Sequence, residues 1–452
     1  MQRFFKYLLR FLFVLIGLIA LLLVFTLAPV DNTPYQQTEY YQKAQENLSH
    51  IAQPPASNPK DTLKAGWAKV NFTTVYSTPT AGYGAREGRH WQAVLDSVFV
   101  RAIVLHNGTT KAAIVSADLL IIPPAVTEQL KKRLAEVGFS WENVYTGATH
   151  SHNSLGGWAS GWTGEMFGGK YDPKIVTYIT DKILTAIKAA SQNLAPVQIG
   201  YGQMYQADMI RNRLVGDKGT IDAFIRLLKF QKESGESALL CTYAAHATTL
   251  DADQEKILSR DYPGALVDSL EHKSANFALF MAGAVGSMGP LGEEKNDTLQ
   301  LRNEAIGLQL EIEHNLKRVQ VSTNSTLNIV TLPLPLREPH ARIADNWRFR
   351  PWVFKKLFGD YPADLKALRI GNVVLVGTPC DFSGELVTNF QKVSAKKGVN
   401  LVITSFNGGY IGYITPDKYY HMDSYETRTM NWFGPQNEAY LSEMIDKLVE
   451  KL

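Results

Sequence analysis

The feature that most constrains this 452-residue chain is an uncharged, mostly apolar stretch at its N-terminus, Phe11 to Val30. As a helix, this stretch is long enough to cross the roughly 30 Å hydrocarbon layer of a membrane. Arg3, Lys6 and Arg10 precede it and Asp31 follows it, so the positive-inside rule keeps the N-terminus in the cytoplasm. We therefore predict a single-pass protein of the cytoplasmic membrane whose main body lies on the extracytoplasmic side.

A cleaved signal peptide is the alternative to a retained helix. The apolar run is long, no A-x-A site follows it, and Pro29 obstructs cleavage after Ala28, all of which favour retention. The two cysteines, Cys241 and Cys380, lie far from this region, so no lipoprotein anchor is available. We predict four parts: a basic cytoplasmic segment (1–10), a transmembrane signal-anchor (11–30), a polar linker that forms a tether or a peripheral helix (31–62), and a catalytic domain (63–452).

The rest of the chain has the composition of a folded protein, with 45% hydrophobic residues. Its 46 basic and 43 acidic residues nearly cancel and form no dense basic block, so nucleic acid is not implied as a partner. Alternating hydrophobic periods predict strands over 98–105, 111–122, 143–146, 223–231, 238–243 and 277–281, a hairpin-like pair over 368–376, and helices over 124–137, 174–191 and 304–319. We therefore expect a mixed α/β fold of layered β-sheets flanked by helices, preceded by one transmembrane helix.

Polar residues follow several of these expected strands. His150 and His152 come after the strand at 143–146, His246 comes after the strand at 238–243, and Asp381 follows the hairpin. Each has an ordinary explanation when taken alone: loop histidines, a hydrogen-bonded core histidine, and an N-cap for a helix over 382–391. Two histidines and a carboxylate at separate strand ends nevertheless make a plausible zinc site.

Several segments in the same order resemble the neutral, non-lysosomal ceramidases. The most specific is Gly147-Ala-Thr-His-Ser-His152 followed by Gly156-Gly157, which is similar to that family's G-T-H-T-H-S-G-P-G-G. Further similar segments are Ala81-Gly-Tyr-Gly84, Val115-Ser-Ala-Asp118, Asn212-Arg213, Gly377-Thr-Pro-Cys-Asp-Phe382, Tyr410-Ile-Gly-Tyr-Ile-Thr415, Tyr425-Glu426 and Gly434-Pro435. The resemblance covers roughly residues 63–435.

This resemblance implies that one zinc ion is bound by His150, His246, Asp381 and Tyr413, with Asp381 replacing the family's glutamate. It makes His152 and Arg213 the residues that stabilise the reacting group. A zinc-activated water would then hydrolyse the amide bond of ceramide or a ceramide-like N-acyl lipid, releasing fatty acid and sphingoid base. Asp118 and Asp251 are candidates to orient the ligand histidines, although a structural hydrogen bond is the simpler role for both.

The chain departs from the family pattern in two places. Where the family carries a serine, in a turn of the form G-D-V-S-P, Gly286-Ser-Met-Gly-Pro290 places Gly289. Ser287 lies two residues earlier, so it is either a displaced catalytic hydroxyl or an ordinary serine in a glycine-rich turn. The chain also ends soon after Gly434-Pro435, so we expect the family's catalytic N-terminal domain without its C-terminal β-domain.

These departures keep two alternatives open: a zinc hydrolase of a different N-acyl or ester substrate, and a non-catalytic, membrane-tethered binding protein. A ceramide-like substrate agrees with a membrane tether, so we expect a lipid substrate at a membrane and no obligate protein partner. Basic residues interleave with aromatic residues between Trp347 and Phe358, a pattern that suits a lipid surface.

Overall fold

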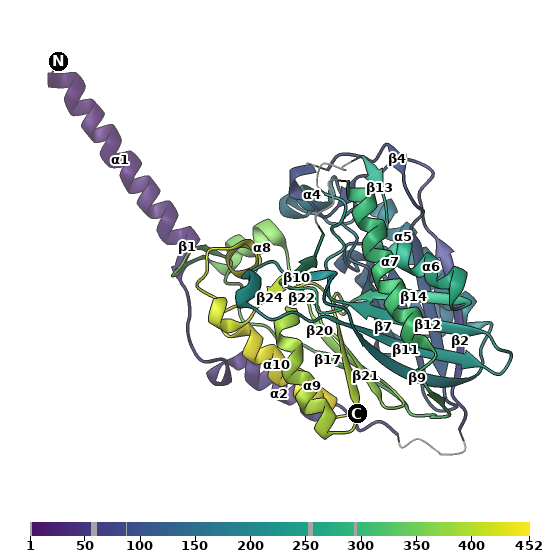
Figure 1. Ribbon diagram of the computed structural model, residues 1–452. Helices are drawn as coiled ribbons and strands as arrows, with labels where there is room; N and C mark the ends of the chain where they lie inside the picture. The colour runs from purple at the N-terminus through teal and green to yellow at the C-terminus, as the bar shows by residue number, and fades with distance from the viewer. Residues whose placement is uncertain (1, 56–60, 87, 252–255, 293–295) are drawn as a thin grey trace.

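A computed structural model describes residues 2–55, 61–86, 88–251, 256–292 and 296–452. Apart from one projecting N-terminal helix, the main elements stack in four layers, in the order helices, large sheet, small sheet, helices (Figure 1). The expected mixed α/β class of layered sheets flanked by helices is confirmed.

The large sheet has nine strands in the order β14-β12-β11-β9-β2-β5-β6-β7, with β16 (Val321–Ser322) paired to β9. Its strands are β2 (Lys64–Asn71), β5 (Phe99–His106), β6 (Lys111–Ala117), β7 (Val144–Ala148), β9 (Ala195–Tyr205), β11 (Phe224–Lys232), β12 (Ser237–Tyr243) and β14 (Phe277–Ala282). Pairing is parallel for β6–β7 and β12–β14, and antiparallel elsewhere. Because parallel neighbours run in the same direction, their carboxyl ends lie together at one end of the sheet. The candidate site described below lies at this end.

The small sheet has four strands in the order β17-β20-β21-β23, namely Leu327–Pro333, Asp364–Ile370, Val373–Gly377 and Asn400–Thr404. Its side chains alternate between two cores, as the period of a strand requires. Leu368 and Ile370 pack toward the large sheet, together with Ile103 and Leu240, whereas the intervening residues of β20 pack toward the outer helices.

Helices cover both outer faces. On the large sheet lie α3 (Pro124–Arg133), α5 (Pro173–Ser191), α6 (Asp261–Lys273) and α7 (Asp297–Leu316). On the small sheet lie α2 (Glu39–His50), α9 (Val387–Lys396) and α10 (Asn437–Val449). Two short helices, α4 (Trp162–Gly168) and α8 (Pro351–Phe358), lie against each other at the end of the molecule from which the N-terminal helix projects.

Most expected elements are present within a few residues of their expected bounds. The helix expected over 304–319 begins earlier, at Asp297, because the side chain of Asn296 caps it by accepting a hydrogen bond from the Leu299 N–H. The helix expected to follow Asp381 begins later, at a 3-10 turn at Gly384. Asp381 itself lies in a short strand, so it does not act as an N-cap.

The N-terminal helix α1 spans Gln2–Thr26, which is earlier at both ends than the expected stretch of 11–30. It ends at Thr26 because Leu27–Pro29 form strand β1, which pairs with β19 (Trp347–Phe349) and through it with β18 (Arg342–Ala344). Length and hydropathy allow α1 to cross a membrane, a property that a signal sequence shares. The segment expected as a tether or a peripheral helix contains α2, and its residues 56–60 lie outside the described part.

Four two-stranded ribbons complete the fold near the ends of the sheets. They are β3 (Thr80–Ala81) with β8 (Ser154–Leu155), β4 (Ala93–Val94) with β13 (Ile257–Leu258), β10 (Ile210–Asn212) with β15 (Met288–Pro290), and β22 (Asp381–Phe382) with β24 (Tyr413–Ile414). The third ribbon is flanked by Arg213 and Ser287, and the fourth contains Asp381 and Tyr413.

Candidate metal centre and active site

Both sheets contribute to one buried cluster of polar side chains. His150 follows β7 and His246 follows β12, so the large sheet supplies the histidines. Asp381 and Tyr413 lie opposite each other in the parallel ribbon β22–β24, beyond the end of the small sheet. The structure thus brings together all four residues expected as metal ligands, although they span 264 residues of sequence from His150 to Tyr413.

The donor atoms are close to one another. One nitrogen from each of His150, His152 and His246 lies within 4.8 Å of the others. The Asp381 Oδ1 atom lies 3.5 Å from the His150 Nε2 atom and 3.3 Å from the His246 Nε2 atom. The Tyr413 hydroxyl lies 3.1 Å from the His246 Nε2 atom.

Backbone carbonyls fix the tautomers of two histidines. The Nδ1 atoms of His150 and His246 lie 2.7 Å and 2.8 Å from the carbonyl oxygens of Leu120 and Met288. A carbonyl only accepts, so each Nδ1 carries the proton and each Nε2 keeps its lone pair for the centre of the cluster. Burial lowers the pKa of His150 to about 3 and holds that of His246 well below its usual value, so both rings are neutral.

This donor set fits a cation. The Asp381 Oδ1 atom is buried and has no hydrogen-bond partner among the described residues, and the nearby Nε2 atoms are acceptors as well. His152 and Arg213 approach these two nitrogens as donors, whereas the buried Asp381 Oδ1 atom has no donor among the described residues, and a positive ion there would compensate its charge. The other carboxylate oxygen of Asp381 accepts a hydrogen bond from Tyr410 at 2.8 Å, which fixes the orientation of the group.

Arg213 connects this cluster to a second group of residues. Its guanidinium lies 3.1 Å from the His246 Nε2 atom and donates to the Tyr413 hydroxyl at 2.9 Å. Its Nε atom donates to Glu426 at 2.7 Å, and the second carboxylate oxygen of Glu426 accepts from the Ser287 hydroxyl at 2.9 Å. Ser287 is fully buried and does not line the cavity described below.

His152 lies between the cluster and the ribbon β3–β8. Its Nε2 atom is 3.2 Å from the His150 Nε2 atom, and because the latter is an acceptor, the His152 Nε2 atom is the donor of this pair. Gly82 has a φ of +136°, and a Cβ atom there would lie 2.7 Å from the His152 backbone and side chain. This close approach explains why a glycine occupies the Ala81-Gly-Tyr-Gly84 motif.

Three non-glycine residues near the site adopt left-handed backbone conformations: His150 (φ +64°), Ser287 (φ +62°) and Phe406 (φ +67°). Such conformations are uncommon and occur mainly where the surrounding structure holds them in place. The Phe406 ring stacks on the His150 ring at 4.3 Å between centroids, so it limits the movement of that side chain.

The cluster lies beside a cavity of 380 Å³. The cavity extends from His150, His152, Asp381 and Tyr413 to the inner sides of α4 and α8, and its other lining residues are mostly apolar. They include Leu120, Ile121, Trp158, Phe167, Phe358, Met430 and Trp432. A polar centre at one end of an apolar cavity is suited to a ligand with one reactive polar group and a hydrocarbon chain.

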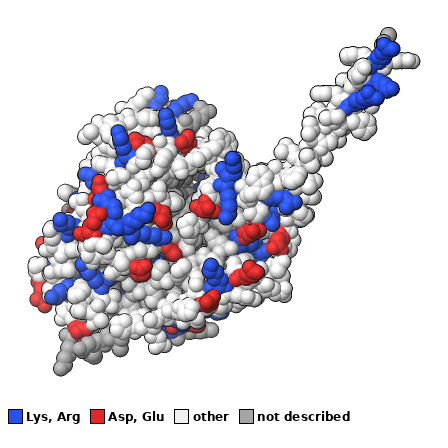
Figure 2. Space-filling model, turned by 180° about the vertical axis from the view of Figure 1, so that it is seen from behind, with Lys and Arg blue, Asp and Glu red and all other residues white. Residues whose placement is uncertain are grey.

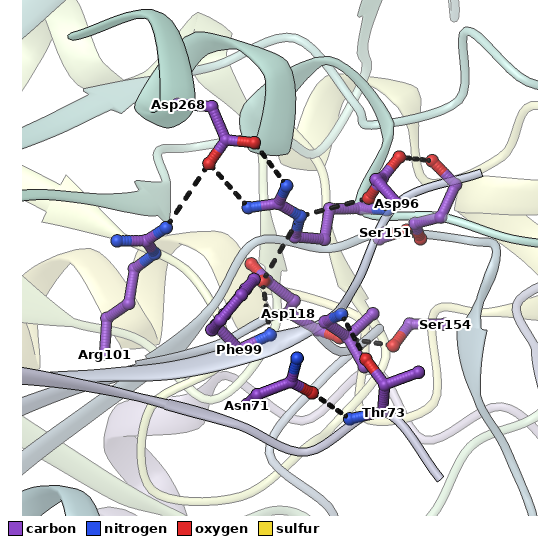
Figure 3. Close-up of polar contacts among 12 residues, drawn as sticks. Asn71, Thr73, Asp96, Phe99, Arg101, Asp118, Ser151, Ser154 and Asp268 are labelled. Carbon is purple, nitrogen blue, oxygen red and sulfur yellow. Dashed lines mark hydrogen bonds and ion pairs between the residues drawn. The ribbon is translucent and has the colours of Figure 1, made fainter. Parts of the chain in front are cut away.

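Asp118 belongs to a separate ionic network (Figure 3). One of its oxygens accepts from the Phe99 N–H at 2.8 Å and lies 3.9 Å from Arg260, which also binds Asp96 and Asp268. The backbone of Asp251 bonds to Arg86 and Asp297. Arg86 also donates to the His152 carbonyl at 2.6 Å, so it ties Asp251 to His152 through backbone atoms, and none of these contacts joins an aspartate carboxylate to a histidine ring of the cluster.

Two functional side chains lack a role in the sequence analysis. Tyr410 holds Asp381, and Glu426 holds both Arg213 and Ser287. Both lie in segments noted there, since Tyr410 opens the motif that contains Tyr413 and Glu426 follows Tyr425. The motifs that contain these two residues were therefore recognised, but their contacts join residues far apart in the sequence and cannot be predicted from residue spacing.

Comparisons with known proteins agree with this geometry. Residues 65–287 match the family model described as "Neutral/alkaline non-lysosomal ceramidase, N-terminal". A neutral ceramidase of Mycobacterium tuberculosis (strain ATCC 25618 / H37Rv) is 22% identical over 201 residues, which are 40% of this chain and 31% of that protein. The match thus spans about a third of that relative's length.

Solved structures extend the likeness in fold to most of the chain. The crystal structure of neutral ceramidase from Pseudomonas aeruginosa has a TM-score of 0.74 at 19% identity and covers 87% of this chain and 75% of its own. A structure titled "Ceramidase complexed with C2" has the same TM-score and identity and covers 86% and 75%. The resemblance inferred from the motifs is confirmed, and residues 381 and 413 lie beyond the family-model match.

Proposed function

Because residues 65–287 match the N-terminal region of the neutral/alkaline non-lysosomal ceramidases, we propose that this chain is a membrane-anchored, zinc-dependent hydrolase of ceramide or a ceramide-like N-acyl lipid. The observation that carries the proposal is the unpartnered Asp381 Oδ1 atom, which faces two neutral histidine nitrogens at one end of an apolar cavity. The products are a fatty acid and a sphingoid base.

One zinc ion would be held by His150, His246, Asp381 and Tyr413. Imidazole and oxygen donors in this number are typical of zinc. When bound, zinc supplies Lewis-acid polarisation of the acyl carbonyl and a lowered pKa for water. Tyr410 keeps Asp381 in place, and the carbonyls of Leu120 and Met288 keep both histidines in the tautomer that ligation requires.

His152 and Arg213 are positioned to stabilise the oxygen of the reacting carbonyl. Once the His150 Nε2 atom is engaged by a cation, the His152 Nε2–H is free to donate to the substrate. Arg213 presents an N–H beside His246 Nε2 and the Tyr413 hydroxyl, and Glu426 fixes the guanidinium through its Nε atom. Donors held in place before the reaction stabilise developing negative charge without reorganisation.

No serine takes part in this scheme. The Ser287 hydroxyl donates to Glu426, and we assign it a role in positioning Glu426 and, through it, Arg213. At Gly289, where the resemblance expects a serine, a Cβ atom would lie 3.5 Å from the Arg213 side chain. Glycine therefore leaves space beside the aliphatic part of the Arg213 side chain that a serine would occupy.

This space favours a second candidate within the same class, a zinc hydrolase of another N-acyl lipid or of an ester. A missing hydroxyl beside Arg213 removes one donor to the substrate, and a site that lacks a donor discriminates less against analogues that lack the matching group. The metal centre and the apolar cavity serve both candidates equally.

We propose that α1 is retained and crosses the cytoplasmic membrane once, with the N-terminus inside and the body outside. Three basic residues, Arg3, Lys6 and Arg10, lie at its free end. Figure 2 shows this basic end, and the rest of the projecting helix without charge. The charge distribution follows the positive-inside rule.

The test is mass spectrometry of fatty acid and sphingoid base released from ceramide in detergent micelles by the purified full-length chain, with and without a zinc chelator. His246→Ala is the site variant, and His421→Ala is the matched control, since His421 is exposed and does not line the cavity. We expect release by the wild type and by the control, and loss of release with chelator or in His246→Ala.

Absence of release from a folded, zinc-loaded chain would exclude ceramide as the substrate and move the proposal to the second candidate, with N-acyl and ester lipids as the next substrates to assay. Absence of stoichiometric zinc in the purified chain would contradict the metal centre itself.

A further inference from the structure

The rim of the cavity and the end of α1 form one structure. Strand β1 pairs with β19, so Leu27, Ala28 and Pro29 lie opposite Phe349, Arg348 and Trp347. Three further hydrogen bonds join the last turn of α1 to the start of α8. Arg350 donates its backbone N–H to the Thr26 carbonyl at 2.8 Å and its Nε–H to the Val24 carbonyl at 3.0 Å, and the Trp352 Nε1–H donates to the Phe25 carbonyl at 3.1 Å. No flexible spacer separates the helix from the body.

The same helix α8 forms one wall of the cavity. Lys355, Lys356, Leu357 and Phe358 line it, and the opposite wall comes from α4. The two helices are joined by a hydrogen bond from the Thr163 hydroxyl to the Leu357 carbonyl. Because α1 is joined to α8, the orientation of α1 in its surroundings also sets the orientation of the cavity end between α4 and α8.

We propose that the surface formed by α4, α8 and β19 lies on the membrane, with the cavity end between α4 and α8 directed at the lipid. We name this surface the rim surface and define it by Trp162, Met166, Trp347, Trp352, Lys355 and Lys356. The inference goes beyond the proposed reaction and rests on the proposed membrane-spanning role of α1. Its occupant is the interfacial zone of a lipid bilayer.

The side chains of the rim surface suit that occupant. Trp162, Trp347 and Trp352 expose 69%, 49% and 54% of their surfaces, which is unusual for tryptophan in a soluble protein. Tryptophan is enriched where hydrocarbon meets headgroups, because its ring is apolar and its N–H polar. Lys355 and Lys356 are exposed, and Lys355 forms an ion pair with the exposed Asp360 at 3.2 Å, so Lys356 is the lysine of this pair that can meet an anionic headgroup.

The length of α1 places this surface at the required depth. The uncharged part of α1, residues 11–26, is about 24 Å long at a rise of about 1.5 Å per residue. This is shorter than the roughly 30 Å hydrocarbon layer. A short span is accommodated by thinning the bilayer or by drawing flanking residues toward it, and the flanking residues here are β1 and the rim surface.

Spin labels on the full-length chain test this arrangement. The native cysteines, Cys241 and Cys380, are buried, so labels can be attached to Met166→Cys and Lys356→Cys on the rim surface. Leu310→Cys is the control, because Leu310 is exposed on α7, away from α1. Each labelled chain is reconstituted into vesicles of phosphatidylcholine and phosphatidylglycerol that carry an aqueous nickel chelate on both sides.

We expect the labels at 166 and 356 to be several-fold less accessible to the nickel chelate, and more accessible to oxygen, than the label at 310. Equal accessibility at all three positions would overturn the proposal. So would a purified mature chain whose mass shows that α1 has been removed.

A second variant tests the junction. A flexible Gly-Ser insertion between Thr26 and Leu27 separates α1 from β1 and should return the label at 356 toward the accessibility of the label at 310. Unchanged protection would show that the strand pairing does not hold the surface in place. Neither measurement uses a substrate, so their failure is distinct from a failure of the proposed hydrolysis.

Discussion

The metal centre depends on side chains whose only task is to hold other side chains. One carboxylate oxygen of Asp381 accepts a hydrogen bond from the Tyr410 hydroxyl, and the other has no hydrogen-bond partner in the described structure. The Tyr410 hydroxyl therefore fixes the direction in which the free oxygen points. Arg213 is held in the same manner by Glu426. Residues of this kind affect affinity for a metal or a substrate without touching either one.

Replacing Tyr410 by phenylalanine removes the hydrogen bond to Asp381 and leaves the ring packing intact. We expect zinc affinity to fall about 10-fold to 100-fold, as is typical when a partner of a metal ligand is lost. Competition with a chromophoric chelator measures the change. Tyr420→Phe is the matched control, since the buried Tyr420 hydroxyl has no partner among described residues, and equal affinities in the two variants would refute the role of Tyr410.

Replacing Arg213 by lysine keeps the charge and loses the planar group that reaches Tyr413, His246 and Glu426 together. We expect kcat for ceramide to fall about 100-fold while zinc content is unchanged. Arg211→Lys is the control, because Arg211 is exposed on β10, the short strand that ends just before Arg213. A kcat close to that of the wild type would remove Arg213 from the mechanism.

At the scale of elements, the hydrophobic period located six strands of the large sheet, the β20–β21 pair and helices α3, α5 and α7. It did not locate the sheet strands β2, β9, β17 and β23 or the helices α6 and α10. The hairpin β5–β6 and helix α5 carry long regular patterns, because one face of each is buried in a continuous core. The short ribbons that complete the site were not expected. A two-residue strand such as β22 has no period, and it forms only because the loops after β21 and β23 are packed together.

Strand β20 contains a buried lysine that makes stability depend on pH. The Lys366 Nζ atom donates to the carbonyls of Trp141 and Val144, and burial lowers its pKa to about 7. An unfolded lysine titrates near 10.5, so between pH 7 and 10.5 the unfolded chain binds more protons than the folded chain. The contribution of Lys366 to the free energy of unfolding therefore increases as pH rises through that window, and the folded state becomes more stable relative to the unfolded chain.

Lys366→Met removes this contribution. Chemical denaturation measures the free energy of unfolding of both proteins. As pH rises from 7 to 10, we expect the wild type to gain stability relative to the variant. Lys64→Met, at an exposed position of β2, should show no such trend. A wild type and a Lys366→Met variant with parallel pH profiles would show that Lys366 keeps its ordinary pKa when folded.

At the scale of the whole molecule, the apolar N-terminal stretch and the catalytic body look like separate modules in the sequence and are joined in the structure. The junction lies in the pairing of β1 with β19, whose partners are about 320 residues apart, a distance at which the sequence carries no pairing signal. The motif resemblance singled out the candidate metal ligands because it carried information from outside this sequence.

Removal of residues 1–30 should loosen the part of the body that borders β1. We expect hydrogen–deuterium exchange to become faster in residues 342–350, because β19 loses its partner strand, and to stay unchanged in β20 and β21. Mass spectrometry of peptides from the full-length and the shortened chain provides the comparison. Equal exchange in β19 would mean that the pairing contributes no local stability.

The placement of the cluster across both sheets has a consequence for biosynthesis. Helix α1 leaves the ribosome before the body of the protein, and Tyr413 and Glu426 follow His246 by more than 160 residues. If α1 is the proposed anchor, a chain under synthesis is held at the membrane with His150 and His246 already translocated but without the Asp381 carboxylate and the Tyr413 phenol that complete the set. Under the proposed topology the metal can be captured only after translation of the C-terminal region, from the ions present outside the cytoplasm.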